Sequence, residues 1–109
     1  MCSYKVLFHK ASGYVVKCNS CSSYQIAFGT MVFTISTQNM VSLFEDVAQL
    51  ERKGLRAQSN PRERFQVKLP CESVIMALTI GELKQFYSML EESFVVEELK
   101  QLLTENNIN

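Results

Sequence analysis

Two cysteines near the start of the chain have the spacing of a metal or redox site. Cys18 and Cys21 are separated by two polar residues in the stretch VVKCNSCSSYQIAF, which covers residues 15–28. Apolar runs flank the pair, so we expect it to lie in a turn between two strands. A C-x-x-C turn can hold two corners of a tetrahedral zinc site, catalyse thiol–disulfide exchange, or carry two inert thiols.

Thiol–disulfide exchange is the less favoured of these chemistries. A thioredoxin-type C-x-x-C lies near a βαβ pattern, and a helix N-terminus lowers the pKa of its nucleophile. Here SSYQIAF follows the pair and predicts a strand. His9 is the single histidine, and no third group is evident that would orient it as a base. We therefore assign no catalytic residues, and we keep a small thiol-dependent redox enzyme using the C-x-x-C pair as the alternative function.

A zinc site needs ligands beyond the pair, and Cys2 is the first candidate. If the N-terminal hairpin turns about Ser12, paired positions sum to about 24, so Cys2 would lie opposite residue 22 and beside Cys21. The sequence thus predicts metal ligands at Cys2, Cys18 and Cys21. Unmetallated structural thiols remain the other interpretation of this cluster.

The fourth ligand stays open between two residues. His9 would pair near Val15, about 10 Å from Cys18 at ~3.3 Å per residue, so it could reach the site only if its strand bends. Cys71 falls in a later turn and could approach if the two halves of the chain pack side by side. Each also has a simpler interpretation, His9 as a surface residue and Cys71 as a small semi-buried apolar residue.

Composition limits the classes of function. The chain has 109 residues, of which 47% are hydrophobic and 20% charged, which suits a single globular domain. Its net charge is zero, which argues against nucleic-acid binding. It shows neither a signal-peptide pattern nor the roughly 18 apolar residues of a membrane span. We expect a cytoplasmic protein with reduced thiols, and no cofactor other than the candidate zinc.

A repeated pattern sets the expected architecture. Residues 26–47 match residues 69–90 in residue kind at a shift of 43. Each copy predicts two strands and a helix, with the second strands at Met31–Ile35 and Val74–Leu78. Ser36 is the expected cap of the first helix, and Thr79 with Glu82 forms a capping box before the second.

The predicted fold is therefore α+β. It has two pseudo-repeated ββα units and an N-terminal β-hairpin, with five or six mostly antiparallel strands covered by two or three helices. We divide the single domain 1–109 into a hairpin with the cysteine knuckle (1–23), a first ββα unit (24–50), an exposed connection (51–63), and a second ββα unit with an extra C-terminal helix (64–109).

Several of these elements also carry a family resemblance. Cys2, Gly13–Tyr14, Cys18, Cys21 and the A-F-G-T turn at 27–30 resemble a family of small uncharacterised bacterial proteins, a domain of unknown function. The resemblance covers about the first third of the chain. It implies no reaction, but it does imply that the three N-terminal cysteines belong to one cluster.

The expected function is that of a small cytosolic non-enzymatic binding or regulatory module with a structural zinc knuckle and an unknown protein partner. A homodimer is also expected. Residues 1–70 carry nine Lys/Arg and four Asp/Glu, whereas residues 71–109 carry two and seven. Such opposite balances, +5 and −5, could assist self-association. The expected interface is the apolar side of the last helix, which comprises Val95, Val96, Leu99, Leu102 and Leu103.

Overall fold

The computed structural model describes residues 3–56, 62–70 and 74–106, and the side chains of these ranges except at 55–56 and 98–106. The fold is α+β, as predicted. Along the chain the elements are β1 (Tyr4–Lys10), β2 (Gly13–Cys18), β3 (Ser23–Phe28), β4 (Met31–Ser36), α1 (Thr37–Arg56), β5 (Phe65–Lys68), β6 (Ile75–Leu78) and α2 (Ile80–Asn106).

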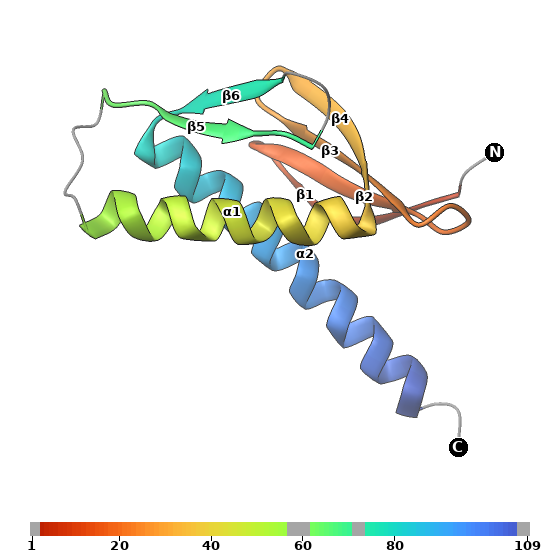
Figure 1. The fold of residues 1–109 in the computed structure, drawn as a ribbon. Helices are drawn as coiled ribbons and strands as arrows, with labels where there is room; N and C mark the ends of the chain where they lie inside the picture. The colour runs from red at the N-terminus through yellow and green to blue at the C-terminus, as the bar shows by residue number, and fades with distance from the viewer. Residues whose placement is uncertain (1–2, 57–61, 71–73, 107–109) are drawn as a thin grey trace.

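The elements form two layers. β1 to β4 make an antiparallel meander in sequence order, and β5 and β6 form a separate antiparallel pair. Both helices lie on the same side of the four-stranded sheet (Figure 1). α2 contacts β1 and β2, whereas α1 contacts β3 and β4. One face of the sheet is therefore covered, and no described element packs on the other.

The core lies between the sheet and the helices. Alternation along β3 sends Tyr24, Ile26 and Phe28 toward the helices, where they are buried. The helices contribute apolar residues at helical spacing, among them Phe86, which packs on Phe28 with ring centroids 5.0 Å apart. The same alternation sends every second residue of β3 to the uncovered face.

Both predicted helix starts are confirmed. The Ser36 hydroxyl accepts a hydrogen bond from the Asn39 amide at 3.2 Å. Thr79 and Glu82 form the capping box, because the Thr79 amide donates to the Glu82 carboxylate at 2.9 Å and the Glu82 amide donates to the Thr79 hydroxyl at 3.2 Å. The backbone hydrogen bond from Thr79 is the main reason that the pKa of Glu82 is lowered.

The C-terminal region differs from the prediction in one respect. Instead of two helices, α2 runs unbroken from Ile80 to Asn106. The expected break falls near Ser93, where the chain has neither glycine nor proline. Ser93 is buried, and its hydroxyl donates to the Met89 carbonyl one turn earlier at 2.8 Å, so the residue is satisfied within the helix.

The connection expected at 51–63 is shorter than predicted, because α1 continues through Arg56. Gly54 explains the difference. It is buried inside the helix rather than in a loop, and a Cβ there would lie 2.6 Å from the Ile80 side chain and 3.2 Å from the Phe65 ring. This glycine permits close packing of α1 on the second half of the chain. Residues 57–61 of the predicted connection lie outside the described residues.

Two further predictions concern pairing and repetition. The hairpin of β1 and β2 has a bulge at Leu7, so the register changes from Val6↔Val16 to Phe8↔Val15. Paired positions therefore sum to 22 or 23 rather than the predicted 24 or so. The order β3-β4-α1 followed by β5-β6-α2 agrees with two ββα units. Whether these units are repeats of one another stays a prediction.

Candidate functional site

The cysteine pair lies in the turn between β2 and β3, as predicted. Cys18 ends β2, and the turn closes with Ser22 in the left-handed region at φ 52°. Two hydrogen bonds hold this turn. The Asn19 amide donates to the Ser3 carbonyl at 2.9 Å, and the Thr37 hydroxyl donates to the Ser22 carbonyl at 2.9 Å. The turn is thereby tied both to the start of β1 and to the start of α1.

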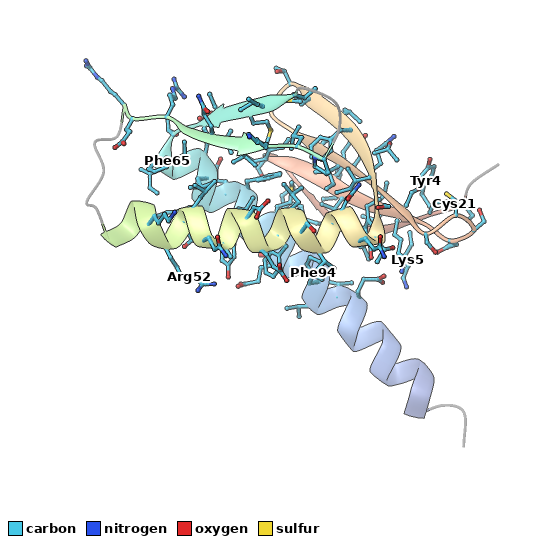
Figure 2. The ribbon with its side chains drawn as sticks, viewed as in Figure 1. Tyr4, Lys5, Cys21, Arg52, Phe65 and Phe94 are labelled. Atoms are coloured by element: carbon cyan, nitrogen blue, oxygen red, sulfur yellow. The ribbon has the colours of Figure 1, made fainter. Side chains whose placement is uncertain are left out.

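The two sulfurs of the turn differ in environment. Cys18 is fully buried and disulfide-bonded, and its Sγ lies 3.4 Å from the Ser20 hydroxyl. Cys21 is an exposed thiol whose Sγ lies 3.1 Å from the Ser23 hydroxyl. Figure 2 shows Cys21 and Tyr4 at the same end of the molecule. One turn thus offers a buried sulfur and an exposed one, and the buried one must be reduced before it can bind a metal.

Of the other predicted ligands, the structure describes only His9. His9 is exposed and pairs with Tyr14, four residues before Cys18. At ~3.3 Å per residue it lies about 13 Å from Cys18, too far to be a fourth ligand. Cys2 and Cys71 lie outside the described residues. Within the described ranges, no group of three or more His, Cys, Asp or Glu side chains is arranged to hold a metal ion.

A charged cluster lies on the covered side of the sheet. Lys5 and Lys17 both form ion pairs with Glu97 of α2, whose side chain is only 11% exposed. The Lys17 ammonium also lies 5.6 Å from the centroid of the Tyr24 ring. The sequence pattern does not reveal this cluster, because Glu97 lies 80 residues from Lys17 and 92 from Lys5 along the chain.

The cluster changes the proton affinity of its members. The hydrogen bond to Glu97 raises the pKa of Lys17. Burial by itself would raise the pKa of Glu97, but the hydrogen bond and charge of Lys17, together with Lys5, outweigh it and hold the pKa below its ordinary value. Burial raises the pKa of Tyr24. Lys17 and Glu97 are therefore charged and paired at neutral pH, whereas Tyr24 stays neutral, and the ion pairs fasten α2 to β1 and β2.

The face of the sheet opposite the helices carries no charged side chain. By alternation, twelve residues of β1 to β4 point to this face. None is Asp, Glu, Lys or Arg. We call it the open face and define it by Tyr4, Val6, His9, Tyr14, Val16, Cys18, Ser23, Gln25, Ala27, Val32, Thr34 and Ser36. Cys18 occupies a position on this face but is itself buried.

Large apolar side chains are exposed on the open face. Tyr4 is 53% exposed, and Val6 and Val32 are each 58% exposed. The Tyr14 hydroxyl donates to the Gln25 side chain at 2.9 Å, which satisfies one polar pair within the face. The three charged residues of this sheet, Lys5, Lys10 and Lys17, all lie on the helix side and pair with glutamates of α2. This is the reverse of the usual pattern, in which charged residues take the solvent side of a sheet.

Small hollows lie on the surface of the described residues. One, with a volume of about 270 Å³, lies between α1 and β5 and is lined by Leu50, Lys53, Val67 and Lys68 among others. Ligand pockets commonly measure about 300–1,000 Å³ and enclose most of the ligand. The open face is therefore the more prominent candidate for recognition.

No helix in the described ranges is long and apolar enough to cross a membrane. Comparison with curated proteins and with solved structures gives no significant match. The sequence profile of the "Family of unknown function (DUF6686)" matches residues 1–109. That family has no stated activity, and its match covers every element described above, including the cysteine turn and the open face. The chain therefore belongs to the family of unknown function DUF6686.

Proposed function

We propose that the protein is a small, cytoplasmic, non-enzymatic binding module that recognises a protein partner through the open face. One observation carries this proposal: twelve outward positions contain no charge, while all three lysines of the sheet point to the helix side. A sheet face that only meets water gains from charged residues, which aid solubility and discourage association. Their absence here favours a face that is covered during function.

Exposed apolar side chains on both edges of the face agree with this role. Monomeric proteins rarely expose contiguous apolar patches larger than about 300–600 Å², and such patches are often functional. Burying apolar area contributes about 25 cal/mol per Å². Exposed Tyr4, Val6 and Val32 lie on the two edge strands β1 and β4, so a partner that spans the sheet would bury all three.

Photocrosslinking in cells tests the proposal. Replacing Val32 by benzoylphenylalanine places the crosslinker on the open face. Replacing Val41 by benzoylphenylalanine is the matched control, since Val41 is 41% exposed on α1. We expect a discrete crosslinked protein band from position 32 that disappears when Val6→Lys is added. No band from position 32, or equal bands from both positions, would contradict the proposal.

A second candidate function belongs to the cysteine turn. We propose that the reduced protein binds zinc through Cys18 and Cys21, with Cys2 as a further ligand. The support is the spacing of the pair in a tight turn closed by left-handed Ser22, and the hydrogen bond that holds Ser3 beside Asn19. Two thiolates from one turn suit two corners of a tetrahedral zinc site, where the metal stabilises the fold.

Metal analysis of protein purified under reducing conditions tests the zinc site. We expect close to one zinc per chain, a thermal midpoint that falls when a chelator is added, and a larger loss for Cys18→Ser than for Cys71→Ser. Equal melting of the two variants with no chelator effect would rule the site out. If the protein instead lacks metal and a thiol titrates below about 7, the thiol-dependent enzyme becomes the better hypothesis.

A further inference from the structure

We infer that the partner of the open face is a second copy of this chain, so that two four-stranded sheets stack face to face in a homodimer. The inference rests on the proposed function, because it identifies the occupant of the same face. It differs from the interface expected from the sequence, which was the apolar side of the C-terminal helix. Three properties of the face support it: charge, area and shape.

The charge pattern favours a second copy. In a two-fold symmetric dimer the same surface meets itself, so a charge near the symmetry axis would approach its own copy across the interface. The open face has no charge of either sign, and this source of repulsion is absent. A charged partner would find no complementary charge on the face to steer its approach. A neutral face is thus better suited to its own copy than to an acidic or basic partner.

The area suffices for a weak to standard dimer. Four strands about 4.8 Å apart, each about six residues long at ~3.3 Å per residue, cover a plane of about 19 by 20 Å, or roughly 400 Å². Side chains raise the accessible area above that of the plane, so two copies would bury at least about 800 Å² in total. Stable interfaces bury about 1,200–2,000 Å² in total, and smaller ones are weak or transient. We therefore expect a dissociation constant in the micromolar range.

The shape of the face suits sheet-on-sheet packing. Uncharged side chains occupy its centre, where Val16 pairs with Gln25 and Tyr14 pairs with Ala27, while exposed Val6 and Val32 lie on the edge strands. Two such sheets pack about 10 Å apart with their side chains interdigitated, as in β-sandwich proteins.

α2 is less suited to self-association in the part whose side chains are described. Val95 is 49% exposed, but Val96 already packs against the core of its own chain. Glu91 is exposed on the preceding turn, so two copies of this helix that met there would bring like charges close together.

Light scattering after size exclusion, over about 5–200 µM, tests the inference, because this range brackets a micromolar dissociation constant. Val6→Lys and Val32→Lys each place a charge on the open face. Val41→Lys and Val95→Lys are matched controls on α1 and α2. All four residues are more than 40% exposed, so the variants should fold, and circular dichroism would verify this.

We expect the wild type to dimerise and both open-face variants to weaken the dimer at least about tenfold, while both controls leave it unchanged. A wild type that is monomeric throughout, or a dimer that only Val95→Lys disrupts, would overturn the inference. The crosslinking experiment separates this failure from failure of the proposed function. A monomeric protein that still crosslinks from position 32 to another protein would retain the binding module and lose only the homodimer.

Discussion

At the scale of single residues, two glycines in left-handed conformations differ sharply in their surroundings. Gly13 has φ +155°, and a Cβ there would lie 1.9 Å from the backbone carbonyl oxygen of Ala27 on the neighbouring strand. Backbone atoms within a sheet can shift only at a large cost in free energy, because their hydrogen bonds would be distorted. We therefore predict that Gly13→Ala lowers the free energy of unfolding by about 2–4 kcal/mol, through steric overlap and backbone strain.

Gly29 provides the matched control for this prediction. Its φ is +60°, but no atom lies within 4 Å of the position of a Cβ. Gly29→Ala should therefore cost only the intrinsic penalty of the left-handed region, about 1–2 kcal/mol. Thermal melts of both variants provide the measurement. Equal losses would mean that the contact between Gly13 and Ala27 does not constrain the sheet.

Glu97 gives a prediction about pH. Its pKa is lowered in the folded protein, so its pairing stabilises the fold above the ordinary pKa of a glutamate and this contribution is lost as the pH falls through the folded pKa. We predict that Glu97→Gln lowers the free energy of unfolding by about 1–2 kcal/mol at pH 7, because it removes a charge-assisted hydrogen bond. The variant should also lose less stability than the wild type between pH 5 and pH 3.

Glu92→Gln is the control for Glu97. Its ion pair with Lys10 is exposed on both sides, with side chains 49% and 62% exposed, and such pairs contribute about 0–1 kcal/mol. Urea titrations of both variants at several pH values would separate the two cases. If Glu92→Gln were as damaging as Glu97→Gln, burial of the Glu97 cluster would not be what makes it stabilising.

At the scale of elements, the capping box of α2 offers a local test. Thr79→Ala removes the hydroxyl that accepts from the Glu82 amide, and we predict a loss of about 1 kcal/mol in the free energy of unfolding. Thr30→Ala, in an exposed turn outside any helix, should change it by less than about 0.5 kcal/mol. Urea unfolding of both variants is the measurement, and equal effects would show that the cap is not stabilising.

Element starts were predictable from the sequence because they depend on local chemistry. The hydroxyl of Ser36 and the capping pair at Thr79 and Glu82 act within one helical turn, so their spacing is visible in the sequence. The role of Gly54 was not predictable, because a glycine in a charged stretch is typical of a loop. Only the structure shows that Phe65 and Ile80 pack against it. The bulge at Leu7 was hidden for the same reason, since it depends on burial of two adjacent residues.

At the scale of the whole molecule, the candidate sites also divide into one that local sequence predicts and one that depends on packing between distant residues. The turn position of Cys18 and Cys21 followed from the two apolar runs around it. The open face could not be predicted, because the sequence of a strand with apolar residues on both faces does not show which face the helices cover. The segregated charges, which suggested self-association, pair within the chain: among the described residues, every ion pair joins residues 1–70 to residues 71–109.

The molecule is elongated, with extents of 52 × 28 × 25 Å, and the C-terminal end of α2 projects beyond the two layers (Figure 1). Glu97, which binds Lys5 and Lys17, is the last residue of α2 with a described contact to the sheet. If the open face forms the dimer, we expect the projecting end to contribute little to the core or to association. We predict that a chain ending at residue 98 melts within about 4 °C of the full chain, since 4 °C corresponds to about 1 kcal/mol in a domain of this size.

The same truncated chain should dimerise with a dissociation constant within about threefold of the full chain, a difference of less than about 1 kcal/mol. Light scattering and thermal melting on the two lengths give both measurements. A truncated chain that folds but stays monomeric would move the interface to the end of α2, where Leu99, Leu102 and Leu103 lie in the sequence. A truncated chain that unfolds would show that these leucines complete the core, and that α2 packs on the rest of the molecule beyond Glu97.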